Sequence, residues 1–249
     1  MSKKEIPEIL TIHGLRNGYE TGSFSPRDVV KSVIERSAAL AEKHIFITPP
    51  SMELIGPHLA ELPPMDFKKY PLWGIPFAIK DNIDLAGAET TAACPAYAYR
   101  PKESATVVKK LLAAGAIPIG KTNLDQFATG LVGTRSPYGE VENAYVPARI
   151  SGGSSSGSAV SVACGLAAFA LGTDTAGSGR VPLVASARAK GSGAAEENPP
   201  ACGRPPVLRP DGAGDGAEMA ACGRAARNTR RPGRIHFHRC LRACGKAPL

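Results

Sequence analysis

The sequence lacks any long apolar run. No stretch approaches the roughly 20 consecutive apolar residues of a transmembrane helix, so we expect no membrane span. The N-terminus, which reads Met-Ser-Lys-Lys-Glu-Ile-Pro-Glu, has no apolar signal core, and the expected compartment is therefore the cytoplasm. Cysteine is sparse, at 6 of 249 residues, which excludes a small domain held together by disulfides.

Acidic residues are scarce in one part of the chain only. The net charge is +8, a value that by itself suggests nucleic-acid binding. Residues 183–249 hold 12 Lys and Arg against 5 Asp and Glu, whereas residues 1–182 hold 18 against 17. The positive excess therefore belongs almost entirely to the last 67 residues, and the rest of the chain is close to neutral.

This basic tail, residues 183–249, also has few large apolar residues, and they follow neither a helical nor a strand period. Ala, Gly, Arg and Pro account for 40 of its 67 residues. That composition favours a disordered extension, and it is also what a GC-rich gene yields when it is translated in a shifted frame. We favour the shifted frame over an evolved nucleic-acid-binding tail, because aromatic residues that would stack on bases are not interleaved with the basic ones.

Two further tests apply to the tail. Nucleic-acid binding would be salt-dependent and would vanish when residues 183–249 are deleted. The cluster His236-x-His238-x-Cys240-x3-Cys244 lacks the tight paired spacing of a zinc site, so no metal is expected there.

Residues 1–182 show helical and strand patterns in alternation. An apolar stripe predicts a helix over Asp28–Ala41, with Ser25-Pro26 as its start signal. The remaining predicted strands are 75–79, 117–119 and 166–171, the remaining predicted helices are 104–114, 123–129 and 155–165, and the proline-rich residues 49–72 are expected to connect. This alternation predicts a layered α/β fold with a largely parallel or mixed sheet.

Three segments carry residues that are suited to catalysis. Lys80 follows an apolar strand, residues 151–158 read S-G-G-S-S-S-G-S, and residues 172–180 read G-T-D-T-A-G-S-G-R. Each has an ordinary explanation, such as a solvated lysine or a flexible linker. Together they suggest a serine nucleophile with a lysine base, since burial can lower the pKa of lysine enough to leave it neutral.

These segments resemble the amidase signature family in both sequence and order. The resemblance rests on G-I-P-F-A-I-K-D-N, A-G-A-I-P-I-G-K-T-N, S-G-G-S-S-S-G-S-A-V and G-T-D-T-A-G-S-G-R-V-P, and it covers roughly residues 10–182. Within the family, residues 90–99 and 124–139 are most similar to the allophanate hydrolase branch. The resemblance implies a layered α/β/α fold with a central mixed sheet that is incomplete at its C-terminal side, because family members continue well beyond the last motif.

The resemblance also implies a catalytic triad. Ser178 matches the family's nucleophile, Ser154 matches the bridging serine that follows a cis peptide bond, and Lys80 matches the general base. The backbone N–H groups expected to hold the oxyanion belong to Thr175, Ala176, Gly177 and Ser178. No metal or organic cofactor is implied.

Three further residues receive weaker assignments. Ser155 is expected to support its loop by hydrogen bonding. Gly130 and Tyr138 lie in the stretch that borders the substrate pocket in relatives, although Tyr138 is equally well explained as a turn residue after Pro137.

The implied reaction is hydrolysis of allophanate in urea breakdown. The alternatives are another amidase, a glutamyl-tRNA amidotransferase of the A type, or a non-enzymatic fragment with a nucleic-acid-binding tail. The expected partner is a small-molecule amide; family members often form homodimers, and the sequence leaves the oligomeric state open.

The family resemblance ends near Pro182, within about two residues of the change in composition. We therefore predict that 1–182 is the N-terminal part of an amidase domain and that 183–249 is a shifted-frame or disordered tail. We also expect the 249-residue chain to have little or no amidase turnover.

Overall fold

The structure is a computed structural model that describes residues 5–146 and 149–182. The predictions made above for residues 183–249, including the tail and its His/Cys cluster, lie outside the described residues. No described helix is long and apolar enough to cross a membrane.

The described chain contains five α-helices, three short 3-10 helices and four strands. In chain order they are α1 Ile12–Glu20, α2 Pro26–Ala39, η1 Ala41–Lys43, β1 Phe46–Thr48, α3 Met52–Ala60, β2 Pro76–Lys80, η2 Pro95–Tyr97, α4 Thr106–Ala113, β3 Ile117–Thr122, η3 Gln126–Ala128, α5 Ser156–Ala163 and β4 Phe169–Leu171.

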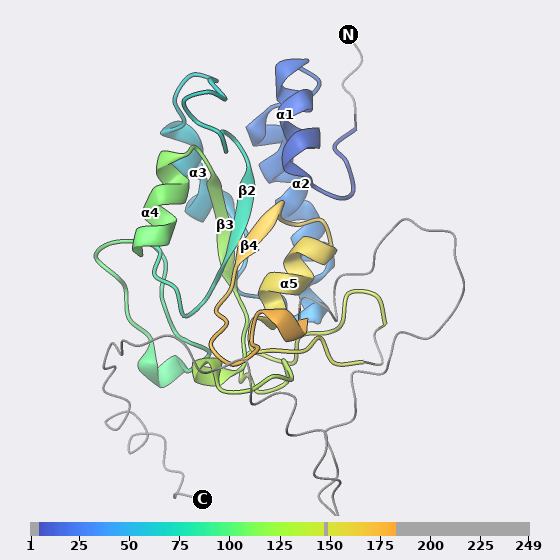
Figure 1. Ribbon diagram of the computed structural model, residues 1–249, viewed down its shortest axis with the longest axis vertical. Helices are drawn as coiled ribbons and strands as arrows, with labels where there is room; N and C mark the ends of the chain where they lie inside the picture. The colour runs from blue at the N-terminus through green and yellow to red at the C-terminus, as the bar shows by residue number, and fades with distance from the viewer. Residues whose placement is uncertain (1–4, 147–148, 183–249) are drawn as a thin grey trace, which may run out of the picture. The chain divides into compact units, whose positions relative to one another are not determined.

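The four strands form one mixed sheet in the order β1-β3-β2-β4. β2 pairs parallel with both β3 and β4, and β1 pairs antiparallel with β3. The carboxyl ends of the three parallel strands therefore meet at one edge of the sheet, and the loops that follow them gather there, at the bottom of Figure 1. The prediction of an α/β fold with a mixed sheet is confirmed.

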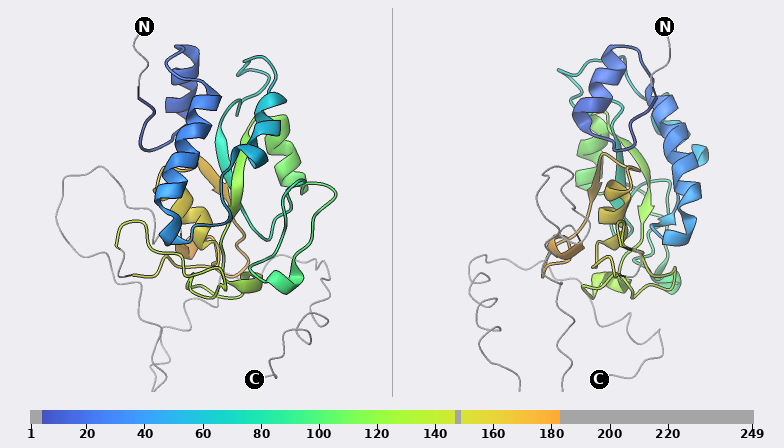
Figure 2. Two further views of the ribbon diagram at one scale, coloured as in Figure 1. Left: turned by 180° about the vertical axis from the view of Figure 1, so that it is seen from behind. Right: turned by 90° about the vertical axis from the view of Figure 1, so that its right-hand side faces the viewer.

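Helices cover both faces of the sheet, because β2 is buried along its whole length and alternates its side chains between two cores. Phe77 and Ile79 pack with Val108 of α4 on one face. Ala78 packs on the other face in a cluster that includes Val30 of α2. The side view in Figure 2 shows the strands between α4 and α2.

The start of α2 follows the sequence signal closely. The Ser25 hydroxyl accepts a hydrogen bond from the Asp28 N–H, and the Asp28 carboxylate accepts one from the Ser25 N–H, which completes a capping box. Pro26 occupies the first turn, where its missing N–H has no consequence.

The predicted helix over 123–129 is wrong. Only the 3-10 turn η3 forms there, and Phe127 has a φ of 53°. The Asn123 side chain, expected as a cap, instead donates to the backbone carbonyls of His44 and Gly139 and accepts from the Ser136 hydroxyl. Its polar groups organise the neighbouring loops, a common alternative to capping for short polar side chains.

The connecting segment 49–72 is wrong in part, because it contains α3. Ser51 caps that helix by accepting from the Leu54 N–H. Pro57 lies inside the helix, and the proline-rich composition concealed it. α1 and β1 were not predicted.

Candidate active site

Lys80 is the last residue of β2, and its side chain is fully buried at the edge of the sheet where the loops meet. Its ammonium group donates to three hydroxyl oxygens: Ser154 Oγ at 2.8 Å, Ser155 Oγ at 3.0 Å and Thr173 Oγ1 at 2.6 Å. An ammonium has three N–H donors, so every donor of Lys80 has a partner. None of these partners carries a negative charge.

This environment makes the Lys80 amine easier to deprotonate. Burial lowers the pKa of Lys80 from 10.5 to about 8, while the negative charges of Asp125 and Asp174 act in the opposite direction. A buried ammonium loses its hydration, and hydroxyl groups replace only part of it. At pH 7 roughly a tenth of such a group is neutral and able to accept a proton.

Ser154 and Ser155 lie between the glycine pair 152–153 and α5. The Gly153–Ser154 peptide bond is cis, as the resemblance implies for the bridging serine. Both serines are almost fully buried. The Ser155 hydroxyl also accepts from the Thr173 N–H at 3.2 Å and donates to the Thr173 carbonyl at 3.2 Å, so it joins this loop to the turn after β4.

Ser178 lies in that turn and is 7% exposed. Its carbonyl accepts a hydrogen bond from the Ser155 N–H at 3.0 Å, which brings the two serine-bearing loops together. Among the described residues, no hydrogen bond joins the Ser178 hydroxyl to the Ser154 hydroxyl. The structure therefore groups Lys80, Ser154 and Ser155 through their side chains and places Ser178 beside them through its backbone.

The turn around Ser178 is stabilised by Asp174. Its carboxylate accepts from the Gly177 N–H at 2.8 Å and from the Arg180 N–H and guanidinium at 2.9–3.1 Å. Hydrogen bonds from Arg180 hold the pKa of the Asp174 carboxyl far below its usual range. Of the four N–H groups expected to hold an oxyanion, that of Gly177 is therefore committed to Asp174, whereas Thr175, Ala176 and Ser178 make no backbone hydrogen bond to described residues through theirs.

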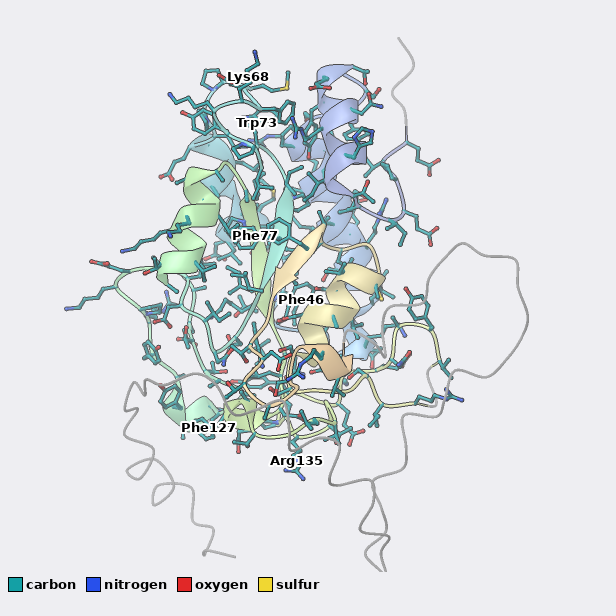
Figure 3. All side chains as sticks on the ribbon, in the orientation of Figure 1. Phe46, Lys68, Trp73, Phe77, Phe127 and Arg135 are labelled. Atoms are coloured by element: carbon teal, nitrogen blue, oxygen red, sulfur yellow. The ribbon has the colours of Figure 1, made fainter. Side chains whose placement is uncertain are left out.

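Gly130 and Tyr138 belong to the loop that follows η3 at the same end of the molecule. Figure 3 shows Phe127 and Arg135 of this region there, away from the sheet core that Phe77 occupies. Gly130 has a φ of +147°, a backbone conformation that side chains rarely adopt. The Tyr138 N–H donates to the Ser136 hydroxyl within a turn and its side chain is partly exposed, so its substrate role stays a prediction.

An open groove of about 1060 Å³ runs along α5 and β4 and reaches the site. Ser155, Thr173, Asp174 and Arg180 line one part of it, and small apolar residues of α5 line much of the rest. A small amide could approach Thr173 and the Ser178 turn from this side.

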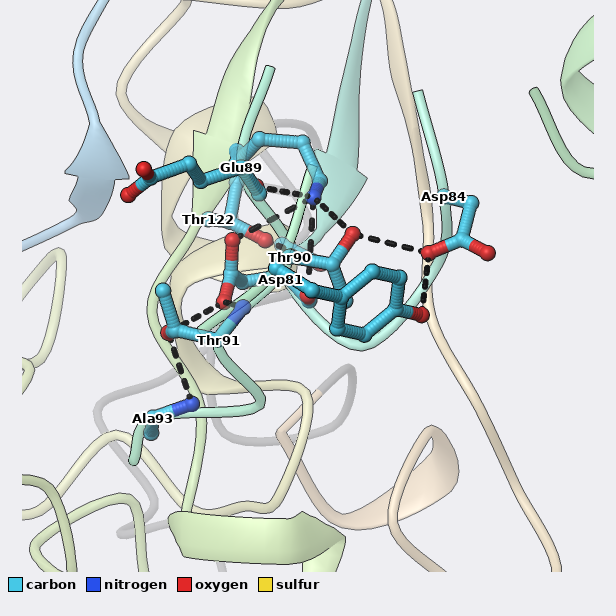
Figure 4. A network of polar contacts seen from close by, with 10 residues as sticks. Asp81, Asp84, Glu89, Thr90, Thr91, Ala93 and Thr122 are labelled. Carbon is cyan, nitrogen blue, oxygen red and sulfur yellow. Dashed lines mark hydrogen bonds and ion pairs between the residues drawn. The ribbon is translucent and has the colours of Figure 1, made fainter. Parts of the chain in front are cut away.

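A second buried lysine lies one strand away. Lys121 of β3 forms an ion pair with Asp81 at 3.3 Å, and both side chains are fully buried. The Lys121 ammonium also donates to the Glu89 carbonyl and to the Thr90 hydroxyl (Figure 4). Burial lowers the pKa of Lys121, and the charge of Asp81 acts to raise it.

Two residues of the site were missed in the sequence. Thr173 stands inside the last motif, and a hydroxyl directly after β4 was the available signal. Asp125 lies inside a stretch noted only for its resemblance, and its full burial was not apparent because a helix was expected there. In the described part of the chain, no group of His, Cys, Asp and Glu side chains has the geometry to hold a metal ion.

Comparisons with known proteins agree with the motifs. The family model described as Amidase matches residues 28–186. The chain is 64% identical to the urea amidolyase of Saccharomyces cerevisiae over 112 residues, which are 45% of this chain and 6% of that protein. It is 41% identical to the A-type polypeptide of the glutamyl-tRNA(Gln) amidotransferase of Alkaliphilus metalliredigens over 179 residues, which are 70% of this chain and 36% of that protein.

A solved structure is also similar. The allophanate hydrolase of Kluyveromyces lactis matches with a TM-score of 0.62 and 42% identity, over 70% of this chain and 29% of that one. The chain thus spans well under two thirds of the length of these relatives. The resemblance seen in the motifs is confirmed, and the chain belongs to the Amidase family.

Proposed function

We propose that this chain carries the serine–serine–lysine machinery of an amide-bond hydrolase whose substrate is allophanate. The observation that carries the proposal is the buried Lys80 amine, which has a lowered pKa and lies 2.8 Å from the Ser154 hydroxyl. A buried lysine that contacts hydroxyls and no carboxylate is suited to accept a proton rather than to hold a fixed charge.

The acylation step follows from these positions. Neutral Lys80 takes the proton of the Ser154 hydroxyl while Ser154 takes the proton of the Ser178 hydroxyl. The Ser178 oxygen then attacks the amide carbonyl carbon, and the N–H groups of the turn hold the resulting oxyanion. The carbon–nitrogen bond breaks, the proton returns through Ser154 to the leaving nitrogen, and ammonia departs.

Deacylation repeats the proton path with water. Water loses a proton through Ser154 to Lys80, adds to the acyl carbon and releases the acid from Ser178. The oxyanion donors are those of Thr175, Ala176 and Ser178 at first, because the Gly177 N–H already donates to Asp174. Each step uses only the chain's own groups, the substrate and water.

Allophanate is favoured as substrate by the match to allophanate hydrolase in both sequence and structure. The longer match to a glutamyl-tRNA(Gln) amidotransferase favours a second candidate, release of ammonia from an amide such as glutamine. Ammonia release from allophanate and from glutamine, measured side by side, separates the two.

The test of the site itself uses a fluorophosphonate probe, which reacts with activated serines and needs no complete substrate pocket. We expect covalent labelling of the full chain at Ser178, found by peptide mass spectrometry, and its loss in Ser178→Ala. Ser32→Ala on the distant helix α2 is the matched control and should label normally. Labelling that persists in Ser178→Ala, or that is absent at pH 9, would contradict the proposal.

A further inference from the structure

Asp125 is a buried carboxylate that the proposed reaction does not use. Its side chain is fully inaccessible to solvent. It accepts three backbone hydrogen bonds, from the N–H groups of Val132 and Gly133 at 3.1 Å and from that of Arg135 at 2.9 Å. An ionised carboxylate is an acceptor only, and three N–H donors match that form.

The carboxylate lies directly against the loop that carries Ser154. A Cβ atom added to Gly153 would lie 2.2 Å from Asp125 Oδ2, so the glycine leaves room for this contact. The Asp125 N–H donates to the Ser154 carbonyl at 3.3 Å. Asp125 therefore contacts the Gly153–Ser154 unit through both its side chain and its backbone, while Lys80 binds the Ser154 hydroxyl from the strand.

The negative charge of Asp125 has no close cation. Among the described residues, no ion pair forms with its carboxylate. Arg135 contributes only its backbone N–H, and its side chain points away from the core in Figure 3. A buried charge of this kind acts strongly on other buried charges, because little water screens it.

The other charged groups around Lys80 are already paired. Asp174, in the turn after β4, forms an ion pair with Arg180 at the surface. On the neighbouring strand, Lys121 forms the buried ion pair with Asp81. The charge of Asp125 acts to raise the pKa of Lys80, against the effect of burial.

We propose that Asp125 is a positioning residue for the Lys80–Ser154 pair: it fixes the loop that carries Ser154 and supplies the unpaired buried negative charge that retains the proton of Lys80. This inference rests on the proposed function for its meaning. The protonation of Lys80 can nevertheless be measured without any substrate.

The first experiment titrates Lys80 in the full chain by 13C NMR of the lysine Cε signals, with Lys80 assigned by its absence in Lys80→Met. Asp125→Asn removes the charge and keeps an acceptor oxygen. Loss of an attractive charge should move the Lys80 midpoint down by about one pH unit, within the usual range for a neighbouring opposite charge. Asp84→Asn is the matched control, because Asp84 is also a hydrogen-bonded carboxylate at this end of the sheet, and it should leave the Lys80 midpoint in place.

A second variant separates charge from position. Asp125→Glu keeps the charge but displaces the carboxylate, so the Lys80 midpoint should stay near its wild-type value while fluorophosphonate labelling of Ser178 slows several-fold. If Asp125→Asn does not fold by circular dichroism, Asp125→Ser is titrated in its place. An unchanged Lys80 midpoint in the folded neutral variant overturns the role of Asp125 whether or not Ser178 labels, whereas failure of Ser178 labelling in wild type contradicts the proposed function alone.

Discussion

Two fully buried lysines lie at the ends of adjacent parallel strands, and they differ in their partners. Lys80 ends β2 and donates to three hydroxyl groups. Lys121 lies in β3 and forms an ion pair with Asp81. Burial acts in the same direction on both pKa values.

The difference shows that burial alone does not make a lysine a base. A carboxylate partner retains the proton of Lys121 and converts it into a fixed structural charge. Hydroxyl partners solvate the Lys80 ammonium without neutralising it, so its proton can leave near neutral pH. The comparison predicts that the two lysines fail in different ways when they are replaced.

Replacement of Lys80 should remove chemistry. Lys80→Met leaves the Ser154 hydroxyl without a proton acceptor, and we expect the rate of fluorophosphonate labelling at Ser178 to fall by about 10³-fold or more. Lys121→Met is the matched variant. If it slows labelling as much as Lys80→Met while remaining folded, the assignment of the base to Lys80 is wrong.

Replacement of a member of the second pair should remove stability. Asp81→Asn leaves the Lys121 ammonium buried without its counter-charge, and breaking a buried pair in this way costs about 3–5 kcal/mol. Urea unfolding followed by circular dichroism measures the loss. The double variant Asp81→Asn/Lys121→Met should recover part of it, because no isolated charge remains; equal losses in single and double variants would argue against the pair.

The pH dependence of labelling should report Lys80. The neutral amine is the active form and its pKa is about 8, so the rate should rise about tenfold per pH unit below pH 8 and level off above it. Labelling rates between pH 6 and 10 measure this. A rate that falls as pH rises through 8 would reverse the assigned protonation states.

The smallest effect is expected at Thr173. Thr173→Val removes one of the three acceptors of the Lys80 ammonium, which destabilises the charged form and moves the rise in labelling rate to lower pH. The loss of one hydrogen bond should lower the free energy of unfolding by about 1 kcal/mol. Ser161→Ala, which removes a buried hydroxyl elsewhere on α5, should lower stability similarly without moving the pH profile.

Local signals in the sequence predicted most of the elements that build the site. Ser25 and Asp28 indicate the start of α2 through contacts three residues apart, and the apolar run before Lys80 predicts β2. The family motifs marked Lys80, Ser154 and Ser178, and the structure groups them at one edge of the sheet.

Contacts between distant residues could not be predicted in the same way. Asp81 and Lys121 are 40 residues apart, and their pairing depends on the parallel register of β2 and β3. The segment after Asn123 looked helical because its side chains are also good caps. In the folded chain those side chains bind loops whose proximity is a tertiary property.

The Asp81–Lys121 pair has a consequence for the dynamics of the loop after β2. The Asp81 carboxylate accepts the Thr91 N–H at 2.8 Å, and the Lys121 ammonium binds the carbonyl of Glu89. This loop is therefore held to the sheet by two charged side chains instead of a strand ladder. In hydrogen exchange, the Thr91 amide should exchange as slowly as the amides of β2, because it opens only when a buried charge is exposed to water.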